Sequence, residues 1–499
     1  MNTTAATAAG RVRGLVEDGL TVFRGIPFAQ PPVGEARFAA PRPAAPWDGV
    51  RDAVAFGPQP PQSPMRPGMP IVPETSTDWL TLNVWTPEAD RAARRPVLVW
   101  VYGGAYLSGS SAIPVYNGRK LAGDVVLVTF NYRVGVEGFT QIAGAPANRG
   151  LLDQIAALRW VRENIEEFGG DPDQVTVFGE SAGAGSVAAL LAMPAARGLF
   201  HRAIAQSVPG TYFSAELAAD IATALVSDLG LSPTVADLAA VDPYKLAELP
   251  TTLRPAMPRF ADRWGTVAHT ITPFSPVVDG ESLPQAPWQA LAAGEAREVP
   301  LIVGHTRDEY RILLAASGRM GKITAEQATR ALDVFGPGPE SESAYRAAFP
   351  DATDEYLFEL VQSDWTLRMP SLHLAEAAVA GGGRAHVFDL TFVAPADGGR
   401  LGACHGLDVP LTFGELDTYA GMPFDLFGSE PSAEAQALSA WIRSAWISFA
   451  STGFPGWPAY DPEQRLTQIL DDEVTTSAYP EEESRRLWAG HTFDVLPLL

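Results

Sequence analysis

The chain has 499 residues, 46% of them hydrophobic, a composition typical of a globular protein with ample core. Its 58 acidic and 36 basic residues give a formal net charge of −22, which disfavours nucleic acids and anionic membrane surfaces as partners. The single cysteine, Cys404, excludes an intrachain disulfide, and no apolar run approaches the roughly 18 residues of a membrane helix. Residues 1–10 lack the basic and apolar regions of a secretory signal, so we expect a cytoplasmic protein.

The first third of the chain predicts small strands followed by buried ones. Residues 10–57 are rich in turns and predict short antiparallel strands that decorate one end of the fold. Six prolines between residues 59 and 77 exclude helix and sheet there and predict a stiff surface loop. Apolar runs at 80–85, 96–102 and 124–130 predict buried strands. Apolar residues at helical spacing predict an amphipathic helix over 148–168, which ends at Gly169.

The next segment carries a serine in a distinctive setting. Residues 175–178 form a β-branched and aromatic run typical of a buried strand, and Gly179-Glu180-Ser181-Ala182-Gly183 follows it directly. A run with helix-forming composition continues from 184 to 193 and stops at Pro194. Strand, G-x-S-x-G and helix together predict a nucleophile elbow, in which Gly179 and Gly183 leave room where a Cβ would collide.

The rest of the chain predicts further strands separated by helical insertions. Apolar runs at 201–206, 299–304 and 386–390 continue the series of buried strands, and residues 438–449 predict an amphipathic helix. Helical insertions are expected at about 207–279 and about 324–369. Alternating strands and helices predict an α/β fold with a mostly parallel central sheet flanked by helices. No flexible linker bounds the insertions, so we expect residues 1–499 to form one domain.

A serine nucleophile needs a base and an acid that orients the base. The strand at 299–304 is followed by Asp308 and Glu309, at the sheet edge where such folds keep their active sites, and both carboxylates are candidates. Of the four histidines beyond them, three are interpreted as structural or terminal: His373 within a helix, His386 at the start of a strand, and His491 near the end of the chain. His405 lies in a small-residue loop and is the best base on pattern.

The charge that develops on the carbonyl oxygen during attack needs backbone N–H donors. Tyr102-Gly103-Gly104-Ala105-Tyr106 directly follows a buried strand and is similar to the glycine-rich loop that supplies such donors. Ala182, the residue after the serine, would provide another N–H.

These motifs occur in an order that resembles the type-B carboxylesterase family, which includes para-nitrobenzyl esterases and cholinesterases. The resemblance runs nearly end to end, through the stretches at 23–32, 78–83, 100–106, 131–135, 168–172, 178–183, 276–280, 306–309 and 405–408. It implies an α/β-hydrolase fold and a catalytic triad of Ser181, Glu309 rather than Asp308, and His405. It places the oxyanion donors at Gly104, Ala105 and Ala182, and a second serine and acid behind the triad at Ser207 and Asp408.

The chain departs from the family pattern at three positions. The histidine common before the oxyanion glycines is Tyr102, as in cholinesterases, and the third glycine is Ala105, which keeps its N–H but adds a methyl group. The cysteine common in the stretch at 78–80 is Trp79, so that disulfide is absent.

The resemblance implies a serine carboxylesterase of the bacterial type that acts on a small-molecule ester through an acyl-serine intermediate, without metal or organic cofactor. The loop at about 59–77 would form the rim of the substrate opening, and the protein would be a monomer or weak homo-oligomer. Activity should fall as His405 protonates, near pH 6–7. A same-fold enzyme acting on amides, carbamates or lactones, or by acyl transfer, stays an alternative, as does a non-catalytic binding protein. Candidate substrate-binding residues are Tyr106, Phe213, Leu313 and Phe413.

Overall fold

The structure is a computed structural model that describes residues 3–64, 71, 73–421 and 425–499. The chain divides into two compact units. The first consists of Met1–Ala203, Thr211–Pro287 and Val495–Leu499, and the second of Ile204–Gly210 and Trp288–Asp494. Among the helices of the described residues, none combines the length and the apolar character that spanning a bilayer requires.

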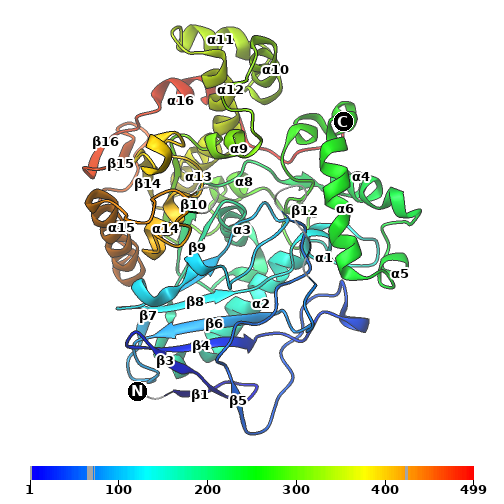
Figure 1. Cartoon of the computed structure of the whole chain (residues 1–499), viewed down its shortest axis with the longest axis vertical. Helices are drawn as coiled ribbons and strands as arrows, with labels where there is room; N and C mark the ends of the chain where they lie inside the picture. The colour runs from blue at the N-terminus through cyan, green and yellow to red at the C-terminus, as the bar shows by residue number, and fades with distance from the viewer. Residues whose placement is uncertain (1–2, 65–70, 72, 422–424) are drawn as a thin grey trace. The chain divides into compact units, whose positions relative to one another are not determined.

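The first unit holds a sheet with the strand order β9-β7-β8-β6-β4-β3, drawn from dark blue to cyan in Figure 1. Strand β7 pairs in parallel with β8 and β9, whereas β6 is antiparallel to both β8 and β4, and β4 to β3. The bounds of the strands in this unit are β1 Thr4–Ala6, β2 Arg11–Arg13, β3 Leu15–Glu17, β4 Leu20–Pro27, β5 Val50–Asp52, β6 Thr81–Thr86, β7 Arg95–Val101, β8 Val126–Phe130, β9 Gly170–Glu180, β11 Phe213–Ser214 and β12 Val277–Val278.

Burial explains why the middle strands read as continuous apolar runs. All residues of β8, and those of β7 from Val97 onward, are inaccessible to solvent, as expected for strands covered on both faces. The strands predicted at 80–85, 96–102 and 124–130 are therefore confirmed within one or two residues at each end. The N-terminal decoration is only partly antiparallel, because β2 pairs antiparallel with β1 but parallel with β5.

The helices of the first unit include the two that flank the elbow strand. Both α2 and α3 pack against β9. The predicted helix at 148–168 is α-helical only to Asn164 and ends in a 3-10 turn, Ile165–Phe168, that Gly169 terminates with φ +83°. The helix bounds are α1 Gly135–Phe139, α2 Arg149–Asn164, α3 Ala182–Ala192, α4 Ala215–Val226, α5 Val235–Leu238, α6 Pro243–Ala256 and α7 Ala261–Trp264.

The proline-rich loop and the insertion at about 207–279 differ in how closely they match the sequence prediction. In the proline-rich loop, residues 59–64, 71 and 73–77 contain no helix or strand, and 65–70 and 72 lie outside the described residues. The insertion at about 207–279 contains the predicted helical pieces, drawn in green in Figure 1 as α4 to α6, and also the short parallel pair β11 and β12, which the sequence pattern did not indicate.

The second unit has the strand order β16-β15-β14-β13-β10. Strands β13, β14 and β15 pair in parallel, β16 is antiparallel to β15, and α13 packs on β13 and β14. The bounds of the strands are β10 Arg202–Gln206, β13 Leu301–Thr306, β14 Ala385–Leu390, β15 Leu466–Leu470 and β16 Thr475–Ala478. The bounds of the helices are α8 Pro287–Ala292, α9 Arg311–Ala316, α10 Ala325–Phe335, α11 Ser341–Ala348, α12 Asp354–Ser363, α13 Met369–Ala380, α14 Asp408–Phe413, α15 Ala433–Thr452 and α16 Glu482–Trp488.

Three features of the second unit differ from the sequence prediction. The strand expected to end at 304 continues to Thr306, so His305 belongs to the strand. The insertion expected at about 324–369 runs on through a π-helical turn, Asp364–Arg368, into α13 and ends at Ala380. Strands β15 and β16 were not predicted, because their mixed polar composition lacks an apolar run.

Candidate active site

Ser181 stands at a sharp turn between β9 and α3. Its backbone has φ +56° and ψ −126°, a conformation that non-glycine residues rarely adopt and that a tight surrounding must enforce. A Cβ added to Gly183 would lie 2.0 Å from the carbonyl oxygen of Val101, and one added to Gly179 would lie 2.7 Å from the same oxygen. The predicted steric reason for both glycines is confirmed. The N-terminus of α3 begins at the next residue and directs its dipole toward this turn.

The loop after β7, in the same unit, has three successive residues with positive φ. Gly104 has φ +115°, and Ala105 and Tyr106 are both left-handed, with φ +55° and +57°. Hydrogen bonds hold this backbone: the Gly104 carbonyl accepts from two N–H groups of the following turn, and the Ala105 carbonyl accepts from Thr272 Oγ1 at 2.9 Å. A Cβ on Gly103 would lie 3.0 Å from Ser181 Cβ, so the loop backbone packs directly on the elbow.

Two stacked tyrosines support the start of this loop. The rings of Tyr102 and Tyr132 lie 4.4 Å apart with an angle of 19° between their planes. The Tyr132 hydroxyl donates to the Tyr102 carbonyl at 2.6 Å, and the Tyr102 hydroxyl donates to the Tyr132 carbonyl at 3.2 Å. Burial raises the pKa of Tyr102 well above its ordinary value, so its hydroxyl keeps its proton. Tyr102, which stands where the family commonly has histidine, therefore has a structural role.

Glu309 and His405 meet in the second unit. His405 Nδ1 donates to Glu309 Oε2 at 2.6 Å, and the Thr306 N–H donates to Glu309 Oε1 at 2.9 Å. The Glu309 side chain is fully buried, whereas 16% of the His405 side chain is exposed. Burial alone would raise the pKa of Glu309, but the charge and hydrogen bond of His405, with help from the Ser207 hydroxyl, hold that pKa below its ordinary value. Glu309 is thus an ionised partner for an imidazole.

Of the two rival acids, only Glu309 bonds to the imidazole. Asp308 Oδ2 instead accepts a hydrogen bond from the backbone N–H of Ala403 at 2.8 Å. The sequence pattern alone left both carboxylates open, because the direction of a side chain in a turn is set by the surrounding backbone.

Ser207 and Asp408 lie in the second unit with Glu309. Asp408 Oδ2 accepts from Gln206 Nε2 at 2.6 Å, and Gln206 Oε1 in turn accepts from Trp446 Nε1 at 3.3 Å. Burial raises the pKa of Asp408 to about 6, and the nearby charge of Glu309 acts in the same direction. Asp408 is therefore a second buried acid whose charge influences Glu309 and His405.

The candidate substrate-binding residues are mostly buried. Tyr106 and Phe213, in the first unit, are each 2% exposed, and the Tyr106 ring packs on Phe139 with the ring centres 4.6 Å apart. Phe413, in the second unit, is inaccessible, whereas Leu313 on α9 is partly exposed. The other histidines noted above have structural surroundings: His386 bonds to the Trp457 carbonyl, and His373 packs on Phe493.

Two residues with clear roles in this region were missed by the sequence reasoning. Tyr132 lies just after β8, and its place directly beyond a buried strand was the one signal in the sequence. Nothing in the sequence indicates that it pairs with Tyr102. Thr272 lies 167 residues from Ala105 in a stretch without a motif, so no sequence signal pointed to it.

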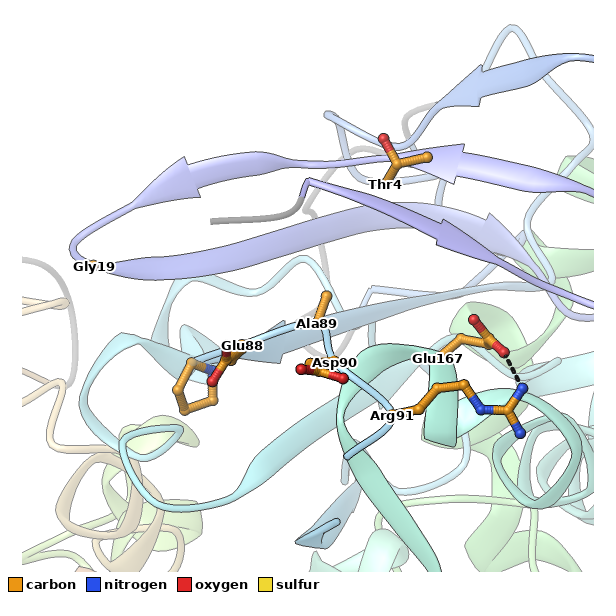
Figure 2. Close-up of a pocket in the computed structure, with 8 residues that line it drawn as sticks. Thr4, Gly19, Glu88, Ala89, Asp90, Arg91 and Glu167 are labelled. Atoms are coloured by element: carbon orange, nitrogen blue, oxygen red, sulfur yellow. Dashed lines mark hydrogen bonds and ion pairs between the residues drawn. The ribbon is translucent and has the colours of Figure 1, made fainter. Parts of the chain in front are cut away.

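A cavity of about 620 Å³ in the first unit is separate from these residues. Figure 2 shows the side chains that line it, with Arg91 and Glu167 joined by an ion pair of 2.7 Å. Its lining residues 87–91 precede β7, whereas the loop at 103–106 follows that strand. The cavity therefore lies near the start of β7, roughly 20 Å from the loop at its end. None of the predicted site residues lines it. Within the described part of the chain, no cluster of three His, Cys, Asp or Glu side chains could hold a metal ion.

Comparison with known proteins places the chain among esterases. Residues 1–488 match the model of the Carboxylesterase family. The para-nitrobenzyl esterase of Bacillus subtilis is 38% identical over 96% of this chain and 97% of its own length. The phenmedipham hydrolase of Pseudarthrobacter oxydans is 37% identical over 94% of this chain and 95% of its own length. A crystal structure of a Geobacillus stearothermophilus carboxylesterase, 35% identical, covers 98% of this chain and 100% of that chain with a TM-score of 0.84. The chain therefore belongs to the carboxylesterase family and is a carboxylic ester hydrolase with the α/β-hydrolase fold.

Proposed function

We propose that the protein hydrolyses carboxylic esters with Ser181 as nucleophile, His405 as general base and Glu309 as the acid that orients the base. The observation that carries the proposal is the 2.6 Å hydrogen bond between His405 Nδ1 and the buried, ionised Glu309. This bond leaves Nε2 of the imidazole as the proton acceptor, as a general base requires. The strained backbone of Ser181 at the start of α3 supports its role as nucleophile.

In this mechanism His405 takes the proton of the Ser181 hydroxyl as the oxygen attacks the ester carbonyl, and Glu309 stabilises the imidazolium. The N–H groups of Gly104, Ala105 and Ala182 would bind the developing oxyanion, and each such donor contributes about 3 kcal/mol in a known hole. His405 then protonates the leaving alcohol. Water attacks the acyl-Ser181 ester with His405 again as base, which releases the acid and restores the enzyme.

Several finer assignments belong to the same proposal. Residues 1–499 would act as one catalytic domain, which the family match over 1–488 supports. Ser207 and Asp408 would tune the Glu309 and His405 pair, and the four candidate residues at 106, 213, 313 and 413 would shape the substrate-binding surface. We also propose a cytoplasmic location and a monomer or weak homo-oligomer. The single cysteine, which is buried, supports the location.

The substrate range is proposed from the named activities of the relatives. Esters of p-nitrobenzyl alcohol are the first class to test, and phenmedipham is the second, because a phenmedipham hydrolase is 37% identical to this chain. One triad serves several acyl bonds, so the second substrate would extend the activity without a change of mechanism.

The experiment measures hydrolysis of p-nitrophenyl and p-nitrobenzyl esters and of phenmedipham by the wild type and by Ser181→Ala. We expect Ser181→Ala to lose nearly all activity, as in subtilisin, where removal of the nucleophile costs about a millionfold in kcat. Ser227→Ala, an exposed serine in the same unit, is the matched control and should keep full activity. A fluorophosphonate probe followed by peptide mass analysis should label Ser181. Full activity of Ser181→Ala would refute the assignment, and an inert, folded wild type would favour a binding protein.

A further inference from the structure

The two adjacent carboxylates at the end of β13 reach different parts of the same loop. Glu309 binds the imidazole of His405, whereas Asp308 binds the backbone two residues earlier. The Asp308 N–H donates to the Ala403 carbonyl at 2.9 Å, and the Ala403 N–H donates back to Asp308 Oδ2 at 2.8 Å. Asp308 also forms an isolated parallel bridge with Cys404. Three residues of the chain, 403 to 405, are thus tied to the turn at 308–309 by backbone and side-chain bonds.

The loop comes so close to Asp308 that only glycine fits. Gly402 has φ +61°, and a Cβ there would lie 2.4 Å from Asp308 Oδ2 and 2.3 Å from Arg311 Nη1. Gly406, just beyond His405, is also left-handed, with φ +78°. Between these two glycines, Ala403 and the buried Cys404 offer no polar side chain that could anchor the loop by itself. The anchor must therefore come from outside the loop.

Two arginines form ion pairs with the Asp308 carboxylate. Arg311 Nη2 lies 3.1 Å from Asp308 Oδ1, and Arg307 Nη2 lies 3.2 Å from Oδ2. Arg311 is itself held by Glu359, with Nε 3.0 Å from Oε1. Only 8% of the Asp308 side chain is exposed, so its bond to the Ala403 N–H is a shielded, charge-assisted bond and stronger than one between neutral groups.

Catalysis depends on this placement because the Glu309–His405 bond is short. A hydrogen bond of 2.6 Å is sensitive to shifts of a few tenths of an ångström in the imidazole, and a shift of about 1 Å can reduce the rate about 10²-fold. Glu309 controls the ring itself, but it cannot control the backbone from which the ring projects. Asp308 bonds to that backbone.

We propose that Asp308 is a positioning residue for the reaction: it fixes the backbone at 403–404 so that the His405 imidazole meets Glu309. The proposal rests on the proposed function, since it assumes that His405 is the base. Asp308 and Glu309 would then divide one task, with Asp308 holding the loop and Glu309 holding the ring.

The test compares Asp308→Ala and Asp308→Asn with the wild type. Loss of the carboxylate in Asp308→Ala should lower kcat by about 10²-fold, because the imidazole is displaced, while KM changes little. Asparagine can still accept from the Ala403 N–H but loses its ion pairs with the arginines, so Asp308→Asn should recover part of kcat. Proton NMR gives an independent readout, because the Nδ1 proton shared between His405 and Glu309 resonates far downfield. That signal should weaken or move upfield in Asp308→Ala and return toward its original position in Asp308→Asn.

Asp364→Asn is the matched control for a loss of stability alone. Asp364, like Asp308, is paired with an arginine, here Arg368; its side chain is fully buried, and its other oxygen accepts from Tyr345 at 2.7 Å. This variant should lose stability yet keep kcat per folded molecule and the downfield signal. The proposal is overturned if Asp308→Ala keeps wild-type kcat per folded molecule, or if its downfield signal is unchanged. His405→Ala is measured in parallel: an active His405→Ala would refute the proposed function itself, whereas an inactive one beside a fully active Asp308→Ala would refute only this inference.

Discussion

Substitution of Gly183 by alanine should strongly lower activity while the protein still folds. The new Cβ would lie 2.0 Å from the Val101 carbonyl oxygen and 2.9 Å from its carbonyl carbon. A relaxed C···O contact is about 3.3 Å, so the elbow and the end of β7 must move apart by about 1.3 Å. Both partners are backbone in regular elements, and neither can turn away as a side chain would. Overpacking of this kind costs about 1–3 kcal/mol of unfolding free energy.

The same displacement acts on the chemistry. Val101 directly precedes the loop whose N–H groups are proposed to bind the oxyanion, and Gly183 lies two residues after Ser181, so the movement separates nucleophile from donors within the first unit. A misplacement of about 1 Å is expected to lower kcat/KM about 10²-fold. Most of this loss should appear in kcat, because the oxyanion contacts form fully only in the transition state.

The assay measures kcat and KM for a p-nitrophenyl ester, together with the thermal unfolding midpoint. Gly123→Ala serves as the control, because Gly123 is exposed in the same unit and an added Cβ meets no atom within 4 Å. It should match the wild type in both measurements. Wild-type kcat/KM and an unchanged midpoint in Gly183→Ala would refute the claim that close contact between the elbow and β7 is needed.

Three further predictions concern charges. Glu309→Gln should keep the fold but lower kcat about 10⁴-fold, as in the comparable change of a protease triad, and steady-state kinetics with a thermal midpoint would separate the two effects. Burial raises the pKa of Asp408 to about 6, so above that pH Asp408 is ionised and its charge favours the protonated imidazole of His405. Asp408→Asn should therefore lower the pKa of His405 and move the acid limb of the kcat/KM profile down by about 0.5–1 pH unit. An acid limb that does not move would contradict this prediction. Arg133 and Asp153 form a fully buried ion pair at 2.8 Å. Asp153→Ala leaves the arginine charge buried without its partner and should cost about 3–5 kcal/mol of unfolding free energy, measured by urea denaturation. A cost below about 1 kcal/mol would show that the pair is replaceable.

The elbow could be predicted from the sequence because its cause is local. A serine at φ +56° between a buried strand and a helix needs small neighbours on both sides, and five consecutive residues carry that whole requirement. The strands at β7 and β8 were equally predictable, since burial on both faces demands an unbroken apolar run. Ser181 and His405 were also indicated by the residue pattern, whereas the choice of Glu309 over Asp308 came from the family resemblance.

Contacts between distant segments were decided only by the tertiary structure. The pairing of Tyr102 with Tyr132, the bond from Thr272 to Ala105 and the return of the Ala403 backbone to Asp308 each join parts of the chain that the sequence separates. The residue pattern alone left Glu309 and Asp308 open; the family resemblance implied Glu309, and the structure bonds Glu309 to the imidazole. Neighbouring carboxylates are chemically equivalent in the sequence, and the backbone of the turn after β13 decides which one points to the histidine and which one to the loop that carries it.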